Sequence, residues 1–238
     1  MKNPNITVAS VSDLDGGQAP LAGANGMLGR LALESQVQSV SATVDYILNI
    51  LQPLTVSISN NKSSNEKGST VTSVLLSWTW SKTIDSQSIN NGIGALAPNI
   101  TSYNHTPIAL TTNTTYTITG IKGVQNSSDG TTVNFYQRRW WGTSPLTSLT
   151  SAQILGLSSN EFSTNRNKSF TINGGGQYIY YAYPSSFGAA TFTVNGLLNT
   201  AWTLFVVSHT NASGFTENYN VYRSNTIQNG SGISIAVS

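Results

Sequence analysis

Cysteine is absent from the 238-residue sequence, and charged side chains make up only 8% of it. The absence of cysteine excludes a disulfide framework and a thiolate metal site, so packing and strand pairing, with or without association between copies, must stabilise the fold. The formal net charge of +2 is too small for the clustered lysines and arginines that nucleic-acid binding by counterion release requires. It is equally too small for a polybasic membrane anchor. We therefore expect no nucleic-acid partner and no membrane insertion.

Long apolar runs are absent as well. No stretch approaches the roughly 18 apolar residues needed to cross a bilayer, and the first ten residues, MKNPNITVAS, lack the continuous apolar segment of a signal peptide. We expect a protein that is synthesised in the cytoplasm and leaves the cell by lysis rather than by secretion.

Residues that carry chemistry are few. The two histidines, His105 and His209, lack the paired spacing of a metal site, and no phosphate-binding loop or nucleophile elbow occurs. A glycosidase needs two carboxylates about 5–9.5 Å apart. Asp45, Glu66 and Asp129 are expected in a helix, a loop and a turn, so Glu161 and Glu217 remain as a conceivable catalytic pair. We expect no metal, no cofactor and no catalysis.

Aromatic and turn-forming residues are abundant by contrast. The chain contains 5 Trp, 10 Tyr, 7 Phe and 21 Gly, together with many Thr, Asn, Val and Ile. Disordered chains lack aromatic and β-branched residues. This composition indicates short strands joined by tight turns, and therefore an all-β fold.

Residues 1–32 show neither a helical nor a strand period and are predicted to form an extended arm. Such a segment is either a loosely held terminus or a docking arm that orders against a partner subunit.

Residues 33–52 carry the one helical pattern of the sequence. Apolar residues recur at intervals of 4, 3, 4, 3 and 4 positions: Leu33, Val37, Val40, Val44, Ile47 and Leu51. This is an amphipathic helix with a heptad seam, about 28 Å long, which Pro53 ends. The helix either packs on the chain's own β domain or oligomerises through these six residues. The seam consists of two alternating sets of positions, Leu33, Val40 and Ile47 in one and Val37, Val44 and Leu51 in the other. Both sets contain β-branched residues, which favours trimers over dimers.

Beyond residue 52 the apolar pattern alternates as in strands, and turn signals recur at the spacing typical of sandwiches. We predict two tandem antiparallel β-sandwich domains, an immunoglobulin-like domain over 53–142 and a C-terminal β domain over 143–238. Asp129-Gly130 is predicted as a hairpin turn and Gly174–Gly176 as a second turn. Strands are predicted at 54–59, 70–80, 115–121, 131–136, 168–172, 177–183, 190–194, 202–208, 218–222 and 233–237.

Two aromatic clusters could form a ligand surface. Rings stack on sugars, and guanidinium groups bind carboxylates or phosphates. The residues of this possible ligand surface are Arg138, Arg139, Trp140, Trp141, Tyr181 and Tyr183. In the alternative, which we prefer, the rings fill the core at the domain junction and the arginines are exposed.

The order of several segments resembles a known family. They are VDYILNILQPLTVSISNN (44–61), EKGSTVTSVLLSWTWSK (66–82), NFYQRRWWGTS (134–144) and GGQYIYYAYPSSFGAATFTVNG (175–196). This order resembles bacteriophage virion fibre and adhesin-like proteins, in which a short helix precedes an immunoglobulin-like domain and a second β domain. The resemblance covers residues 44–238. It implies a head fibre, tail fibre or baseplate appendage on the exterior of the phage particle, with the arm bound to other virion proteins.

We therefore expect a non-enzymatic, homo-oligomeric virion protein that attaches to a glycan or protein of the host surface. One rival is a purely structural tail or capsid-decorating component without receptor binding. The other is a carbohydrate-active enzyme that uses Glu161 and Glu217.

Overall fold

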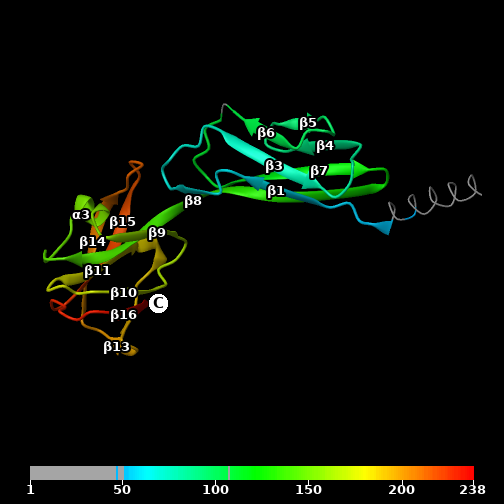
Figure 1. The fold of residues 1–238 in the computed structure, drawn as a ribbon. Coiled ribbons are helices and arrows are strands. Elements are labelled where there is room, and N and C mark those ends of the chain that lie inside the picture. The colour runs from blue at the N-terminus through cyan, green and yellow to red at the C-terminus, as the bar shows by residue number, and fades with distance from the viewer. Residues whose placement is uncertain (1–46, 48–50, 107) are drawn as a thin grey trace, which may run out of the picture. The chain divides into compact units, whose positions relative to one another are not determined.

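The computed structural model describes residues 47, 51–106 and 108–238. The predicted docking arm and most of the predicted helix lie outside the described residues. Within the helix, Ile47 and Leu51 are described, and both have helical backbone conformation. Residues 55–238 form one unit, in which the regular elements are almost all strands (Figure 1). The predicted all-β fold is confirmed.

The elements follow one another as β1 (Val56–Asn60), β2 (Ser64–Glu66), β3 (Val74–Trp80), β4 (Ser86–Ile89), β5 (Gly94–Leu96), β6 (Ser102–His105), β7 (Thr114–Lys122), β8 (Gln125–Ser144), α3 (Ser151–Leu155), β9 (Ser159–Ser163), β10 (Lys168–Ile172), β11 (Tyr178–Pro184), the 3₁₀ turn η1 (Ser185–Phe187), β12 (Phe192–Val194), β13 (Leu197–Asn199), β14 (Trp202–Thr210), β15 (Thr216–Ser224) and β16 (Ile233–Val237).

The first sandwich, residues 55–136, is immunoglobulin-like. One of its sheets has the order β1-β3-β6, and the other has the order β8-β7-β4-β5. The short β2 pairs in parallel with β8, and the other pairs of this sandwich are antiparallel. Strand β3 alternates between buried and exposed residues, as a strand with one face toward a core must.

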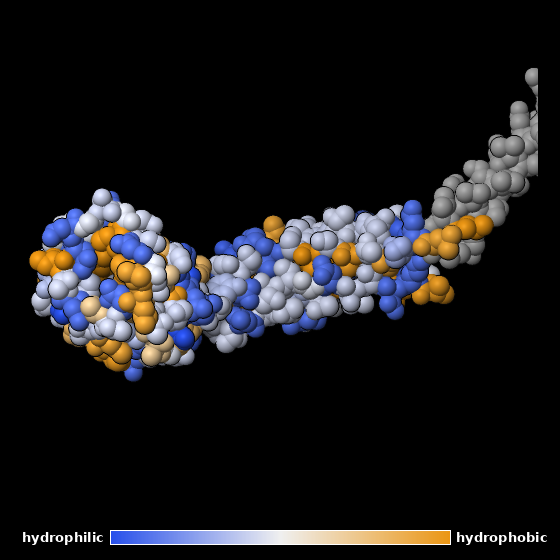
Figure 2. Space-filling view, turned by 90° about the horizontal axis from the view of Figure 1, so that it is seen from below, coloured by the Kyte–Doolittle hydropathy of each residue, from blue (hydrophilic) through white to orange (hydrophobic). Residues whose placement is uncertain are grey.

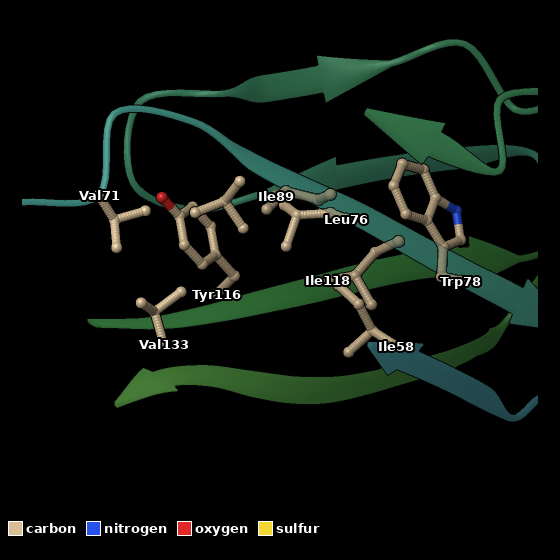
Figure 3. Packing of buried hydrophobic residues seen from close by; sticks show 9 residues of the cluster. Ile58, Val71, Leu76, Trp78, Ile89, Tyr116, Ile118 and Val133 are labelled. Atoms are coloured by element: carbon tan, nitrogen blue, oxygen red, sulfur yellow. The ribbon is translucent and has the colours of Figure 1, made fainter. Parts of the chain in front are cut away.

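Apolar side chains from both sheets fill the space between them (Figure 3). Leu76 and Trp78 of β3 face Tyr116 and Ile118 of β7, and all four are nearly or fully inaccessible to solvent. The cluster also contains Ile58, Val71, Val74, Ile89 and Val133.

The second sandwich, residues 137–238, has three layers, which are two sheets and the segment around α3. Its central sheet has the order β14-β15-β11-β8-β9, and the second sheet has the order β10-β16-β12-β13. Ile179, Tyr181 and Tyr183 of β11 pack with the second sheet. Tyr180 and Ala182 pack on the opposite side with α3 and the residues around it. β11 is therefore buried on both faces, which explains its uninterrupted run of apolar and aromatic residues.

The predicted hairpin turn at Asp129-Gly130 is wrong. These residues lie inside β8, where Asp129 is opposite Ile118. The turn is made by Gly123 and Val124, because Lys122 pairs with Gln125 and Gly123 adopts a positive φ of 57°, as the first residue of a tight hairpin can. Asp129 instead accepts a hydrogen bond from the Ile58 amide at 3.0 Å.

β8 runs without a break through the predicted domain boundary at residue 142. Its pairing with β7 ends at Val133, and its pairing with β9 begins at Gln137. A single strand of 20 residues therefore belongs to both sandwiches.

Candidate functional site

Three of the six residues named for a possible ligand surface lie in the core, where the preferred alternative places the rings. Trp140 is 7% exposed, and Tyr181 and Tyr183 are fully buried. Trp141 is half-buried and packs with Phe170 of β10, with a distance of 5.7 Å between ring centroids. A ligand that approaches from solvent therefore does not contact the three buried rings.

Tyr181 and Tyr183 each have a backbone partner for the hydroxyl. Tyr181 donates to the Arg166 carbonyl at 2.6 Å, and Tyr183 donates to the Gly188 carbonyl at 2.8 Å. Burial raises the pKa of Tyr181 to about 12, so this phenol stays protonated. These hydroxyls hold loops against the sheet, because a buried polar group needs a partner.

The two arginines are paired. Arg138 donates through Nε to Glu66 Oε1 at 3.0 Å, and its guanidinium lies 4.1 Å from the centroid of the Phe162 ring. Arg139 forms an ion pair with Glu161, whose second oxygen lies 2.8 Å from Lys168 Nζ. Both guanidinium groups therefore already have protein partners.

Glu66 belongs to a set of contacts between the two sandwiches, which we call the junction. The junction joins Glu66, Lys67 and Gly68 of the first sandwich to the turn at residues 211–215 of the second. Asn211 donates to the Lys67 carbonyl at 2.7 Å, and Lys67 Nζ lies 4.7 Å from the Phe215 ring centroid.

The junction also includes Glu217. This carboxylate accepts a hydrogen bond from Gln137 Nε2 at 2.8 Å and lies 3.8 Å from Lys67 Nζ. The contacts of the junction are thus charged and polar around one aromatic ring, Phe215. Sequence patterns did not indicate it, because its residues come from segments about 140 positions apart.

Glu161 and Glu217 have separate surroundings. They lie on β9 and β15, and two strands, β8 and β11, separate these in the sheet order. Desolvation raises the pKa of Glu161, but hydrogen bonds from Lys168 and Arg139 outweigh it, so the pKa is lowered. A general acid needs the opposite shift. Among the described residues, no group of three histidine or acidic side chains is placed to hold a metal ion.

His209, which lacks the sequence spacing of a metal ligand, is a buried titratable residue. It is 1% exposed, and its Nδ1 lies 3.1 Å from Ser151 Oγ. Burial lowers its pKa, against smaller opposing contributions from Ser151 and Glu66. Because Ser151 Oγ also accepts the Thr210 amide at 2.9 Å and the imidazole is inaccessible, this pair fixes α3 to β14 and does not present a nucleophile.

One cavity opens between the two sheets of the second sandwich. It has a volume of about 60 Å³ and is lined by Trp202, Asn199, Ser224 and Gln228 among others. This volume accommodates a few water molecules and is too small for a sugar ring.

The predicted oligomerisation residues Leu33, Val37, Val40 and Val44 lie outside the described residues. The remaining two, Ile47 and Leu51, are 47% and 72% exposed.

A membrane-spanning helix would have to be both long and apolar, and none of the helices within residues 47, 51–106 and 108–238 meets these requirements.

Comparisons with known proteins give no family. No family model matches the chain, and no curated protein matches it. Solved structures that are similar in part include two with immunoglobulin domains. The first is the crystal structure of the N-terminal eight Ig domains of Down Syndrome Cell Adhesion Molecule, with 9% identity over 78% of this chain and a TM-score of 0.26. The chain spans only 26% of that structure.

The second similar structure is a tandem pair of titin Ig domains. It is 10% identical, with 78% of this chain and 96% of that chain covered, and its TM-score is 0.20. Scores this low carry no argument, so the immunoglobulin-like assignment of the first sandwich rests on its strand order.

Proposed function

We propose that this chain is a homo-oligomeric, non-enzymatic structural protein of a bacteriophage particle, a head or tail fibre or a related appendage on the particle exterior. The observation that carries the proposal is β8, one strand of 20 residues that belongs to both sandwiches. A strand cannot bend sharply without breaking its ladder, so the two β modules act as one unit. Such a unit suits a protein that holds β domains out from a particle.

Several further features support this role. The junction adds ion pairs and a packed aromatic ring to the covalent link between the modules. Ile47 and Leu51 leave apolar surface exposed at the end of the predicted helix. The arm at residues 1–32 is proposed to bind other virion proteins, in line with the resemblance of residues 44–238 to phage fibre proteins.

The placement of the aromatic cluster bears on receptor binding. Because Trp140, Tyr181 and Tyr183 are buried and both arginines are paired, this cluster is not proposed as the receptor surface. This favours the second candidate, a purely structural tail or capsid-decorating component. A glycan array probed with the intact oligomer distinguishes a fibre that attaches to the host surface from this purely structural component. Saturable binding would support host attachment, and its absence would support the structural role.

Light scattering coupled to size-exclusion chromatography tests the oligomer. At low micromolar concentration the wild-type mass should be a multiple of 25.3 kDa, with three copies favoured, and Val44→Asp should reduce it because a carboxylate in an apolar seam is strongly unfavourable. The matched control is Val124→Asp, since Val124 is fully exposed at a hairpin tip. A strict monomer, or a mass unaltered by Val44→Asp, would contradict helix-mediated association.

A further inference from the structure

β14 is an open edge of the central sheet of the second sandwich. β15 pairs with one side of it, and among the described strands none pairs with the other. It is nine residues long, whereas the edge strands β5, β10 and β13 have three, five and three residues. Its sequence, WTLFVVSHT, contains no Asp, Glu, Lys, Arg, proline or glycine, and its one histidine, His209, is buried. The sequence devices that keep natural edges unpaired are therefore missing.

Hydrogen bonds at both ends of β14 show which backbone groups face outward. The Ala201 carbonyl accepts the Asn225 amide at 2.9 Å, and the Asn211 amide donates to the Phe215 carbonyl at 2.9 Å. Because ladder bonds alternate along antiparallel strands, odd-numbered residues direct their N–H and C=O toward β15. Even-numbered residues direct theirs toward the free edge.

α3 occupies only the last of these outward positions. The Thr210 amide donates to Ser151 Oγ at 2.9 Å. Leu204, Val206 and Ser208 have no such contact among the hydrogen bonds of the described residues. The free edge therefore presents the N–H and C=O groups of three alternate residues, Leu204, Val206 and Ser208, which is enough for a short ladder.

Two of the three side chains at these positions are apolar and exposed. Leu204 is 44% exposed and Val206 is 62% exposed. Their neighbours on β15 are Tyr222 and Asn220, which are uncharged. The charged residues of β15 pair with odd-numbered positions and so lie on the opposite face. Figure 2 shows one side of the molecule, on which apolar residues form patches between polar ones.

We propose that a second copy of this chain adds its own β14 antiparallel to this edge. In the register with a two-fold axis at Phe205, Leu204 of each copy lies opposite Val206 of the other. Both are outward-facing positions, so the ladder bonds and the aliphatic contacts form together. An antiparallel pair of identical strands is self-complementary, and an uncharged strand adds no like-charge repulsion. Pairing of two copies through an edge such as β9 would add like-charge repulsion, because β9 carries Glu161.

The pairing should be weak on its own. One strand pair buries less than the roughly 1,200–2,000 Å² of a standard interface. Helix association, where it occurs, raises the effective concentration of neighbouring edges. If three helices associate, the two-fold pairing links one trimer to another. If two associate, it can close within the dimer. The proposal itself stands on β14 and does not require the proposed helix contact.

Sedimentation equilibrium of the full-length Val44→Asp chain isolates the edge, because helix association is removed. Its mass should rise from monomer to dimer between low and high micromolar concentration. Val206→Lys should lower the association constant by at least about tenfold, since it places a lysine opposite Leu204 of the other copy and two lysines in diagonal positions across the axis. Val124→Lys, at a fully exposed position, is the control and should leave the constant unchanged.

Val206→Pro provides a second variant. It removes an outward-facing N–H and no bond to β15, so it should abolish the dimer and leave the thermal midpoint close to that of the parent. A Val44→Asp chain that stays monomeric at high concentration would overturn the proposal and leave the edge to a strand of another protein. A dimer that survives both changes at Val206 would overturn it as well. Neither result depends on whether Val44→Asp lowers the mass at low concentration, which tests the proposed function.

Discussion

Gln87 joins the two sheets of the first sandwich through its side-chain amide. Its Oε1 accepts the indole N–H of Trp78 at 2.8 Å and that of Trp80 at 2.9 Å. Its Nε2 donates to the carbonyls of Ala97 and Ile100 at 2.7 and 2.8 Å. The amide is 3% exposed, so water cannot replace these partners.

Gln87→Leu should therefore destabilise the protein by on the order of 3 kcal/mol, because it leaves several buried polar groups without partners. Urea unfolding measures the free energy of unfolding. Ser88→Leu introduces the same side chain on the exposed face of β4 and should change it by less than about 0.5 kcal/mol. Equal effects of the two substitutions would contradict the role assigned to the amide.

His209 makes stability depend on pH. Burial lowers its pKa from 6.5, so the unfolded chain takes up a proton near pH 6.5 while the folded chain does not. Stability should therefore fall as the pH drops from 7 to 5. Glu161 affects stability at lower pH. Its pKa is lowered in the folded chain, so the stabilisation by its ionised carboxylate is lost only as the pH falls through this lowered pKa.

His209→Asn keeps a polar partner for Ser151 and removes the titration. The fall in thermal midpoint between pH 7 and 5 should be smaller in this variant than in the wild type. If differential scanning fluorimetry gave the same pH dependence for both, the buried imidazole would not be its source.

At the scale of elements, β7 fits closely against β3 at one glycine. A Cβ atom on Gly120 would lie 2.4 Å from the Trp80 ring. Gly120→Ala should displace this indole from Gln87 and destabilise by about 1–3 kcal/mol. Gly130→Ala, in the adjacent β8, is the control, since its Cβ would meet only ordinary contacts of 3.5 Å or more. Similar urea midpoints for the two variants would argue against this packing.

Strands with one buried face could be predicted from sequence, and polar strands could not. The predicted strands 168–172 and 233–237 coincide with β10 and β16, because Phe170 and Ile235 alternate with small or polar neighbours. β6 and β9 were missed since polar residues occupy all of their positions except Tyr103 and Phe162, and neighbouring strands supply their stability.

The predicted turn at Asp129-Gly130 failed because distant residues decide where the chain turns. Asp-Gly favours a turn locally, but Asp85 accepts hydrogen bonds from Gly123 N and Lys122 Nζ at 2.7 and 2.9 Å and so stabilises the turn at Gly123. Likewise, the arginines beside the aromatic cluster have partners on distant segments. Glu66, for example, is 72 positions from Arg138. Such pairings depend on the completed fold.

At the scale of the molecule, the junction should hold the two sandwiches in one arrangement. Gly68 has a φ of +91°, and a Cβ there would lie 2.3 Å from Phe215 Cβ. Gly68→Ala should therefore separate Phe215 from Lys67 and increase hydrogen exchange at residues 211–215. Gly92 has a similar φ of +82° with no atom within 4 Å, so Gly92→Ala is the control for backbone strain alone. Unchanged exchange in Gly68→Ala would show that the junction does not couple the sandwiches.

Electron microscopy of purified phage particles, labelled with gold-conjugated antibody against residues 55–238, tests the proposed function most directly. The proposal predicts labels at regular positions on the particle exterior, with several copies of the chain at each. Particles that contain no copy of this chain, or that carry it only inside the capsid, would contradict it.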